Sequence, residues 1–401
     1  MSLPLRIAYV VAYPQRLAGA NRSLLELVQH LPADIAPTVI CLGEGAVADA
    51  YRQIGVPVEV VEVRGALGQF GKALLQTSAG QQLRMVGQEL LPLTFALRRR
   101  FRAIGTDLVH VNDSRGALLA VPAARLAGLP VVVHLRGEFP FGTAGRLLFE
   151  LAPDSIIAVS DGVRDSLSRF GRRKTVTIYN GIRPEPPPRT PIPWLAGLRS
   201  RGVCVGVCMA SVVPFKGQHH LIRAVARLNA AGLRDRFTVF CVGELVPGYG
   251  DYQDWLATLR GELGCDNITF AGWSEDPFRF YASADLSVLP SVSSERLTLP
   301  AGTIDVRGNE GFPRTHLEAM VYGLPIVGTR IAGVAEQVED GVTGLLVPAG
   351  DPERLAGALE RLALDPALRA RMGEAGRARV LARFSTTAYV EAVCREYRRL
   401  T

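Results

Sequence analysis

Short apolar runs alternate with amphipathic stretches along the whole chain, which is the pattern of a parallel sheet covered by helices. In the first half this pattern predicts strands at residues 5–11, 37–42, 108–111, 131–135, 155–160 and 175–180. The second half repeats it with strands at residues 203–210, 237–242, 268–270, 286–289, 325–328 and 344–347. We therefore expect an α/β protein that contains two Rossmann-like domains in tandem.

A proline-rich stretch separates the two halves. It reads R-P-E-P-P-P-R-T-P-I-P from Arg183 to Pro193. Such a composition cannot continue a helix or a central strand and acts as a stiff spacer. We place the domain boundary there, between a domain of residues 1–185 and a domain of residues 186–385. The chain of 401 residues is long enough to bury two separate cores.

The positive charge of the chain is concentrated in its first half. Residues 1–190 hold 22 Lys+Arg against 15 Asp+Glu, whereas residues 191–401 hold 23 of each. A basic half indicates an anionic partner, such as nucleic acid, anionic lipid or an acidic substrate. Aromatic residues are too few among these arginines to form a stacking surface for bases, so we expect no nucleic-acid binding.

Cysteine usage and hydropathy indicate the compartment. The six cysteines form no C-x-x-C pair and have no histidine at zinc spacing, which favours a reduced, cytosolic protein. The chain enters a strand by Arg6 without the charged and apolar regions of a signal peptide. No run approaches the 18 uninterrupted apolar residues of a membrane-spanning helix. We therefore expect a cytoplasmic protein.

Two carboxylates mark the most informative segment, E-G-F-P-R-T-H-L-E-A-M-V-Y-G at residues 310–323. A helix that begins near Arg314 would place Glu318 about one turn inside it and Glu310 on the preceding loop. The N-terminus of a helix suits an anion such as a diphosphate, because free N–H groups and the positive dipole end point at it. Carboxylates beside it accept hydrogen bonds from hydroxyls. This combination suits a sugar nucleotide, which has a diphosphate between two hydroxyl-bearing ends.

This segment resembles the E-x7-E signature of the family 4 retaining glycosyltransferases, which have the GT-B fold. The runs G-L-P-I-V-G-T at residues 323–329 and D-G-V-T-G-L-L-V-P at residues 340–348 strengthen the resemblance. The resemblance implies two domains that face across a cleft and a last helix that returns to the first domain. Residues 386–401 are the candidate for that helix. It also implies that the first domain binds the acceptor and the second binds the nucleotide diphosphate sugar.

The resemblance assigns donor-binding roles to the same segment. Glu318 would bind the ribose hydroxyls and Glu310 the hydroxyls of the sugar. The amides of Gly311 and Phe312 would lie near the sugar or the phosphate. The resemblance also implies that a segment containing Trp273 reads the nucleobase through its backbone.

A second donor segment, A-S-V-V-P-F-K-G, lies at residues 210–217. Lys216 stands at a strand-to-helix turn, where a cation is well placed for phosphate. The family pattern has an arginine where this chain has Ser211, so the diphosphate end departs from the family. Gly243 ends a strand and leaves room for a ligand. Residues 291–309 form a longer loop than expected at the mouth of the donor site. The sequence leaves three roles open for this loop: a flexible lid, an acceptor contact or a neutral surface insertion.

The candidate acceptor contacts lie in the first half. Gly19 and Asn21 belong to a small-residue turn after the first strand, where a substrate can approach the backbone closely. A tight connection without any ligand is the alternative. His110 and Asn112 end another strand and would line the same edge of the sheet.

His134 and Arg136 end the next strand, and alternation puts both on one face. The resemblance implies a histidine at this place that touches the donor sugar. The register allows either residue, and we favour His134 as the sugar contact, with Arg136 in the acceptor site. A histidine of the core is the alternative for His134.

The resemblance implies retaining transfer by front-face attack. Lys216 would stabilise the leaving group, Glu310 and Glu318 would position the donor, and His134 would steady the sugar. No D-x-D motif suits a metal–diphosphate bridge, so we expect no metal and no cofactor besides the donor substrate. A silent nucleotide-sugar or carbohydrate-binding protein and a GT-B epimerase or phosphorylase remain rival interpretations. A nicotinamide dehydrogenase is disfavoured, since no G-x-G-x-x-G follows a first strand.

An apolar segment from Leu83 to Phe101 ends in a group of arginines. They are Arg98, Arg99, Arg100 and Arg102. Basic residues there suit an anionic bilayer surface, and they also suit a helix C-terminus on dipole grounds alone. We hypothesise that this region makes peripheral contact with the inner face of a membrane, where a lipid-linked saccharide acceptor would be found.

Overall fold

The chain divides into two compact units, and each is described by itself. The computed structural model describes residues 3–68, 84–137, 149–185, 189–308 and 310–401. Unit 1 comprises Met1–Gly181 together with Thr386–Thr401, and unit 2 comprises Ile182–Ser385. The split therefore lies just before the proline-rich stretch. The last helix, α17 (Thr386–Leu400), belongs to the first unit, as the family resemblance implies.

A parallel sheet of seven strands forms the centre of unit 1, in the order β3-β2-β1-β4-β5-β6-β7. Its strands are β1 (Leu5–Val11), β2 (Ile35–Cys41), β3 (Val58–Val60), β4 (Leu108–Val111), β5 (Val131–Leu135), β6 (Ser155–Ala158) and β7 (Thr175–Thr177). All strands expected in this half are present. The short β3 was not expected, because three residues are too few to show a period.

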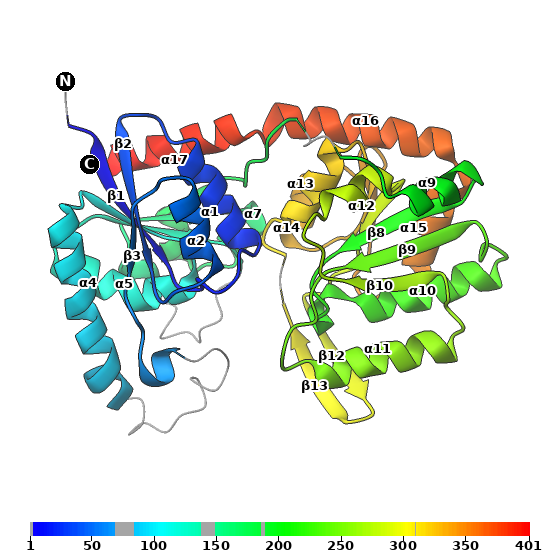
Figure 1. Ribbon diagram of the computed structural model, residues 1–401, viewed down its shortest axis with the longest axis horizontal. Helices are drawn as coiled ribbons and strands as arrows, with labels where there is room; N and C mark the ends of the chain where they lie inside the picture. Colours follow the sequence, from blue (N-terminus) through cyan, green and yellow to red (C-terminus); the bar gives the residue numbers. More distant parts are fainter. Residues whose placement is uncertain (1–2, 69–83, 138–148, 186–188, 309) are drawn as a thin grey trace. The chain divides into compact units, whose positions relative to one another are not determined.

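Helices cover both faces of this sheet (Figure 1). On one face α1 (Gly19–Gln29), α2 (Ala46–Gln53) and α17 bury a common core with the strands. On the other face α4 (Leu91–Ile104) packs against α5 (Ser114–Leu126). The shorter elements are η1 (Gly65–Gly68), the π-helix η3 (Val86–Leu90), α7 (Asp161–Asp165) and α8 (Arg169–Arg173).

Unit 2 repeats the plan with a parallel sheet of six strands, in the order β10-β9-β8-β11-β14-β15. The strands are β8 (Cys204–Met209), β9 (Phe237–Val242), β10 (Ile268–Gly272), β11 (Leu286–Leu289), β14 (Ile326–Thr329) and β15 (Gly344–Val347). Each matches an expected strand within about two residues at its ends, as is usual for strand boundaries. Both units are thus Rossmann-like.

The helices of unit 2 also lie on both sides of its sheet (Figure 1). The core on one side includes α10 (Gln218–Ala230), α11 (Gly250–Glu262) and α15 (Pro352–Leu364). Opposite them lie α9 (Pro193–Ser200), α12 (Phe278–Ser283) and α13 (Arg314–Val321). The remaining elements are η4 (Pro214–Lys216), α14 (Ala332–Gln337) and α16 (Pro366–Arg383).

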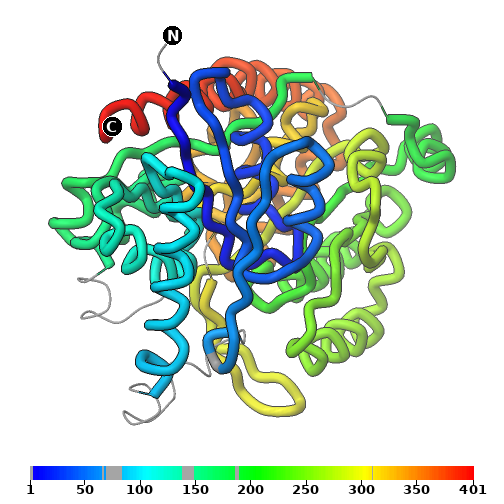
Figure 2. The backbone as a smooth tube through the Cα atoms, turned by 60° about the vertical axis from the view of Figure 1, so that its left-hand side comes forward, coloured from blue at the N-terminus to red at the C-terminus, as the bar shows by residue number. Residues whose placement is uncertain are grey.

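The expectation of a loop at residues 291–309 is wrong. The segment forms an antiparallel hairpin of β12 (Ser294–Leu299) and β13 (Gly302–Arg307), which extends from the rest of unit 2 (Figure 2). Leu297, Leu299 and Val306 are buried, so the hairpin has a core face and a solvent face. The alternation that defines a half-buried hairpin is therefore present in the sequence.

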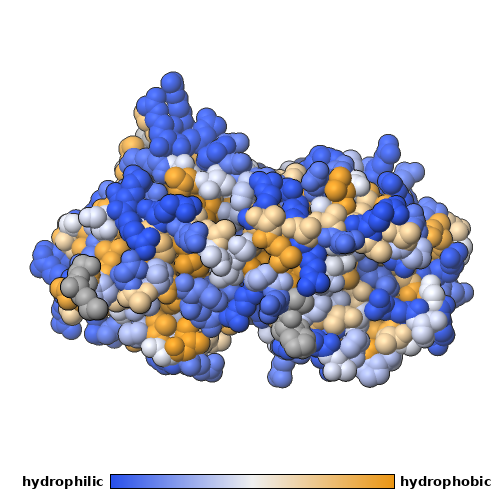
Figure 3. All heavy atoms as spheres, turned by 90° about the horizontal axis from the view of Figure 1, so that it is seen from above, coloured by the Kyte–Doolittle hydropathy of each residue, from blue (hydrophilic) through white to orange (hydrophobic). Residues whose placement is uncertain are grey.

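The surface and the helices bear on membrane contact. On the face shown in Figure 3, exposed apolar side chains are interspersed among polar ones rather than gathered into one patch. Among the residues described, none of the helices has both the length and the apolar character that crossing a bilayer requires.

Candidate functional site

An ion pair lies at the carboxyl edge of the unit 2 sheet. Lys216, at the end of η4, donates from Nζ to Oε1 of Glu310 at 2.5 Å. Ser291, two residues after β11, donates from Oγ to the same oxygen at 2.7 Å. We call these three residues the charged cluster. The structure thus joins Lys216 and Glu310, which lie 94 residues apart in the chain.

Burial and charge act in opposite directions on Glu310. Its side chain is 7% exposed and that of Lys216 is 19% exposed. Burial alone would raise the pKa of Glu310, but the ammonium of Lys216 and the Ser291 hydroxyl outweigh it and hold the pKa below its ordinary value. Glu310 is therefore an ionised hydrogen-bond acceptor at neutral pH, as binding to sugar hydroxyls requires.

Glu318 lies inside α13, as expected, and its side chain is 7% exposed. Arg314, one turn earlier, places Nε at 3.6 Å from Oε1 of Glu318. The hydroxyl of Tyr281 donates to Oε2 at 3.3 Å. Glu318 is thus a second nearly buried carboxylate, held by a cation of its own helix.

No side chain caps the N-terminus of α10 or of α13, so each is a candidate site for an anion. Neither the cap residue Gly217 of α10 nor Pro313 of α13 makes a side-chain hydrogen bond to its helix. Gly217 has φ +72°, and a Cβ atom there would lie 2.0 Å from the carbonyl oxygen of Pro290. Only glycine fits this close approach, which holds the Lys216 turn against the segment after β11.

The other donor candidates of this edge differ in how they are placed. Ser211 and Gly243 touch, since a Cβ on Gly243 would lie 2.9 Å from the Ser211 nitrogen. The side chain of Phe312 is buried against Phe384, with 5.2 Å between the ring centroids, so that only its backbone remains for a ligand. Gly311 abuts α14, because a Cβ on Gly333 would meet its carbonyl oxygen at 1.8 Å.

Trp273 stands apart from this group. It follows β10 and is 63% exposed. Its side chain therefore offers a surface at the edge of the sheet, and the structure does not bring it to the charged cluster.

Three residues in or beside the charged cluster were missed by the sequence analysis. Ser291 anchors Glu310, and Thr329 at the end of β14 donates to the Ser291 carbonyl at 2.6 Å. His316 lies on α13, and Gln337 places Oε1 at 3.1 Å from its Nδ1. Burial lowers the pKa of His316 to about 4. The signal for Ser291 was its position directly after Pro290 at a strand end, where parallel sheets bind ligands.

A second polar cluster lies at the carboxyl edge of the unit 1 sheet. The guanidinium of Arg136 donates to Oδ1 of Asn112 at 2.7 Å and to Oδ1 of Asn180 at 2.7 Å. It also reaches the hydroxyl of Tyr389 on α17 at 3.3 Å. We call Arg136, Asn112 and Asn180 the amide cluster. Asn180 and Tyr389 were not among the expected site residues.

The first βα turn joins this cluster from the other side. Asn112 donates to the carbonyl of Ala20 at 3.3 Å and to Oδ1 of Asn21 at 3.5 Å. Asn21 donates in turn to the carbonyl of Tyr13 at 2.8 Å. Gly19 begins α1, and a Cβ there would meet nothing within 4 Å. Of the expected acceptor residues, Asn21, Asn112 and Arg136 therefore form one hydrogen-bonded group, in which Asn21 fixes the turn.

The two histidines of this edge are fully buried. His110 pairs through Nδ1 with the hydroxyl of Tyr397 at 2.7 Å. His134 packs between His110 and Tyr389, and neither of its ring nitrogens has a hydrogen-bond partner among the described residues. Burial lowers the pKa of His110 to about 3 and that of His134 well below its ordinary value, and Arg136 adds to both shifts. Both rings are neutral core groups in this structure.

Comparison with known proteins bears on what the two edges are for. Residues 205–379 match the sequence model of the family described as "Glycosyl transferases group 1". Residues 17–186 match the model described as "Glycosyltransferase Family 4". Together the two matches take in most of both units.

The chain belongs to glycosyltransferase family 4. Among curated relatives it is 28% identical over 268 residues to the lipopolysaccharide core biosynthesis glycosyltransferase LpsE of Rhizobium meliloti, covering 65% of this chain and 69% of LpsE. It is 33% identical over 301 residues to a D-inositol 3-phosphate glycosyltransferase of Thermobifida fusca, covering 67% of this chain and 64% of the relative. Matches to two further glycosyltransferases of this name span only 52% and 41% of their lengths.

Solved structures agree on the fold of this glycosyltransferase family member. HepE of Anabaena in complex with UDP is matched with a TM-score of 0.78 at 22% identity, over 99% of this chain and 100% of that one. Sucrose-phosphate synthase of Thermosynechococcus elongatus is matched with a TM-score of 0.73 at 18% identity, over 99% of both chains. The two Rossmann-like units are therefore those of the GT-B fold.

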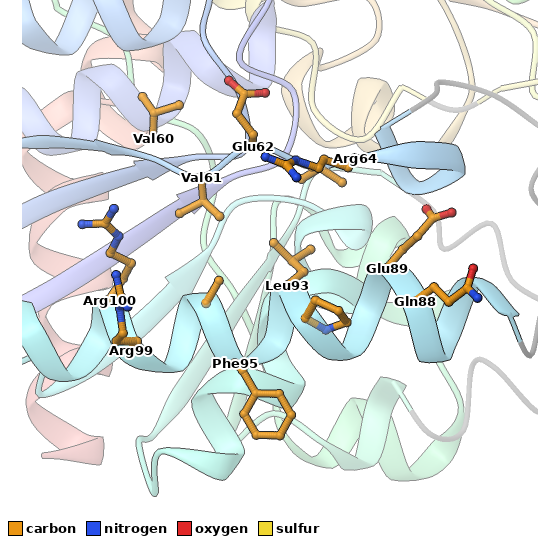
Figure 4. A pocket seen from close by; sticks show the side chains of 13 residues that line it. Val60, Val61, Glu62, Arg64, Gln88, Glu89, Leu93, Phe95, Arg99 and Arg100 are labelled. Carbon is orange, nitrogen blue, oxygen red and sulfur yellow. The ribbon is translucent and has the colours of Figure 1, made fainter.

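A hollow of about 670 Å³ lies in unit 1 beside α4. The segment at the end of β3 and helix α4 line this hollow. The side chains there include valines, Leu93 and the arginines Arg64, Arg99 and Arg100 (Figure 4). In that view Leu93 points from α4 toward Val61, whereas Phe95 extends from the opposite side of the helix.

The arginines at the end of α4 differ in exposure. Arg100 pairs with Glu59 at 3.0 Å, and both Arg98 and Arg100 are half-buried. Arg99 and Arg102 are exposed.

Proposed function

We propose that this protein transfers a sugar from a nucleotide diphosphate sugar to a hydroxyl of a saccharide or lipid-linked saccharide, with retention of the anomeric configuration. The observation that supports the proposal most is the Lys216–Glu310 ion pair beside the open N-termini of α10 and α13. A cation and two helix ends suit the diphosphate, and Glu310 suits the sugar.

The names of the relatives support the same donor and acceptor classes. HepE has been solved with UDP and with UDP-glucose. A Corynebacterium glutamicum relative is named a GDP-mannose-dependent phosphatidylinositol monomannoside mannosyltransferase. LpsE is named for lipopolysaccharide core biosynthesis. Between them, these names include nucleotide sugars as donors and lipid-bearing glycans as acceptors.

In the proposed reaction the bond between the anomeric carbon and the phosphate oxygen breaks. The acceptor oxygen bonds to the same face of that carbon, and its proton passes to the departing phosphate. Lys216 and the amides of the two helix ends stabilise the negative charge on the leaving diphosphate, so no metal ion is required for transfer. Glu310 and Glu318 orient the donor through its sugar and ribose hydroxyls.

The arginine that the family places at Ser211 has a candidate replacement. Arg314 stands in the first turn of α13, and its side chain is 11% exposed. Arg296, by contrast, is 80% exposed on the hairpin beside Asp305. We propose that Arg314 supplies the second positive charge at the diphosphate.

Point variants of the charged cluster test the proposal. K216A and E310A are each expected to reduce turnover at least tenfold, because each removes a charged contact to the donor. K174A is the matched control, since Lys174 donates to the carbonyls of Leu151 and Pro153 in unit 1. Release of nucleoside diphosphate from each donor is measured with and without acceptor, on variants whose circular dichroism matches wild type.

Near-normal turnover in K216A or E310A would overturn the role assigned to that residue. Absence of any donor hydrolysis or transfer by the wild-type protein would favour the silent-binding alternative, which Ser211 suggests. Unchanged turnover after chelation of metals is expected, and loss of turnover would contradict metal-independent transfer.

The role that the resemblance implies for His134 stays a prediction. Its buried ring must gain access to the sugar if it is to steady it, whereas Arg136 is already part of a polar cluster. H134L and R136K are therefore assayed side by side for KM and kcat. If H134L has wild-type kinetics and R136K does not, the sugar contact belongs to Arg136.

We propose that the outer face of α4 contacts anionic lipid, which would bring a lipid-linked acceptor to unit 1. Leu91 and Phe95 are 47% and 57% exposed. They share one helix face with the exposed Arg99 and Arg102, at spacings of three and four residues. Apolar side chains followed by arginines match the layout of a helix that lies in a headgroup region.

Co-sedimentation with vesicles tests this surface. R99E/R102E is expected to lower binding to vesicles containing phosphatidylglycerol, with no change on pure phosphatidylcholine. R371E/R377E on α16 is the control, since it reverses two exposed arginines of unit 2. Equal binding by R99E/R102E and the control would contradict the proposed contact.

A further inference from the structure

Two histidines and a carboxylate converge at the hairpin, outside the charged cluster. His219 and His220 lie in the first turn of α10, and Glu295 lies on β12. Each histidine places Nε2 at 3.0 Å from the same oxygen, Oε2 of Glu295. The potential ligand atoms all lie within 4.8 Å of one another. The proposed transfer reaction uses none of these groups.

The spacing is close to that of a tetrahedral metal site. Zinc bonds to histidine nitrogen and carboxylate oxygen at about 2.0–2.2 Å, so two such ligands at a tetrahedral angle stand roughly 3.3 Å apart. The observed 3.0 Å from each ring nitrogen to the carboxylate oxygen needs only a small outward shift to admit an ion. Imidazole nitrogens with one carboxylate form a donor set that suits a divalent transition metal such as Zn²⁺.

A second layer of contacts already orients His219. Its Nδ1 lies 2.9 Å from the hydroxyl of Tyr252, which in turn lies 3.5 Å from Oε1 of Gln218. A ring whose Nδ1 is held by such a partner presents Nε2 outward, as in histidines that ligate metals. His220 is 6% exposed, and its Nδ1 has no hydrogen-bond partner among the described residues. Its Nε2 is therefore the nitrogen directed at the site.

We propose that His219, His220 and Glu295 bind one divalent transition metal ion of the Zn²⁺ class, which fastens the β12–β13 hairpin to the start of α10. Glu295 is 23% exposed, which gives an ion a path from solvent and leaves the fourth position to water. His219 lies three residues after Lys216, so the ion stabilises the turn that carries the proposed phosphate cation. It does not bridge the diphosphate, and transfer remains independent of it.

Metal titration tests the site on the full chain. Purified metal-free protein is titrated with Zn²⁺ by calorimetry and with Co²⁺ by visible absorption. We expect one ion per chain, the visible absorption bands of Co²⁺ in a tetrahedral site, and a higher melting temperature of the protein with Zn²⁺. E295Q is expected to weaken binding at least tenfold without unfolding the chain, because Glu295 lies on the partly exposed hairpin. H220Q serves as the second variant.

Two controls separate this site from adventitious binding. D305N removes a carboxylate from the facing strand of the same hairpin, where the side chain of Asp305 is 73% exposed. H30Q removes the histidine beside Glu26 in unit 1. Both are expected to bind Zn²⁺ as wild type does. Trypsin cleavage after Arg296 is expected to slow with Zn²⁺ in wild type and not in E295Q. Equal affinity for Zn²⁺ in wild type and E295Q, or loss of Zn²⁺ binding in H30Q, would overturn the proposal. The contacts of Glu295 with His219 and His220 would then be hydrogen bonds that hold the hairpin to α10, without a metal ion.

Discussion

The carboxyl edges of the two parallel sheets bear different kinds of polar group. In unit 2 the charged cluster joins opposite charges, Lys216 and Glu310, through one oxygen. In unit 1 the amide cluster holds Arg136 on two neutral oxygens, those of Asn112 and Asn180. The same fold therefore presents an ionised carboxylate at one edge and a satisfied guanidinium at the other.

This difference indicates how the work is divided. A buried ion pair is costly to desolvate and contributes little net stability, so we infer that this pair is retained for its charge. A guanidinium that is satisfied by amides mainly fixes geometry and leaves less of its charge for a ligand. We therefore propose that unit 2 supplies the charges used in transfer and that unit 1 positions the substrate.

Breaking the charged cluster is expected to have the largest effect on stability. K216M removes the cation that compensates the buried Glu310 and should cost about 3–5 kcal/mol in the free energy of unfolding. K216M/E310Q should recover part of that loss, since no uncompensated charge remains. Denaturant unfolding of both single variants and the double variant measures the coupling. Additive losses would show that the pair is not coupled.

Breaking the amide cluster is expected to cost less. R136M leaves the oxygens of Asn112 and Asn180 without their main donor, which should cost about 1–3 kcal/mol. R136K should recover little, because an ammonium cannot donate to both oxygens and Tyr389 in the planar geometry of a guanidinium. The same denaturant experiment measures both variants. A larger loss for R136M than for K216M would reverse the comparison.

Acid should weaken unit 1 through His110. Burial and Arg136 lower the pKa of His110 from 6.5 to about 3. The pKa of His316 in unit 2 falls less, to about 4, because the Glu310 carboxylate opposes the effect of burial. The unfolded chain then binds a proton as pH falls through 6.5 and the folded chain does not. Stability is full above pH 6.5 and falls by about 1.4 kcal/mol per pH unit toward pH 3.

The H110Q variant isolates this effect. Glutamine can still bond the Tyr397 hydroxyl but does not titrate, so the loss of stability between pH 6.5 and 5 should be smaller than in wild type. Unfolding is measured across that range in both proteins. The same slope in both would show that His110 is not the titrating group.

The smallest expected effect is at His134. Both of its ring nitrogens are buried without a hydrogen-bond partner among the described residues, so H134L should change the free energy of unfolding by less than about 1 kcal/mol. H110L, which removes the His110 partner of the Tyr397 hydroxyl, is the contrasting variant and should cost more. A large loss in H134L alone would point to a polar contact of this ring.

Much of the fold could be predicted from the sequence, because its strands are short continuous apolar runs. The E-x7-E segment also predicted α13 with Glu310 before it and Glu318 within it. The hairpin was missed because its alternation, with Leu297 and Leu299 facing inward, was interpreted as an irregular insertion. The position of Ser291 at a strand end indicated a ligand site, but the distance along the chain hid its contact with Glu310. Burial of His134 was the alternative that the sequence left open, since it depends on α17 packing over the sheet.

The central claim is that Lys216 binds the diphosphate of the donor. The most direct test is the dissociation constant of the tightest binder among UDP, GDP, ADP and TDP, measured for wild type, K216A and the control K174A. A charged hydrogen bond contributes roughly 1.5–3 kcal/mol, so K216A should bind at least tenfold more weakly while K174A binds as wild type does. Equal affinity in K216A and wild type would contradict the account.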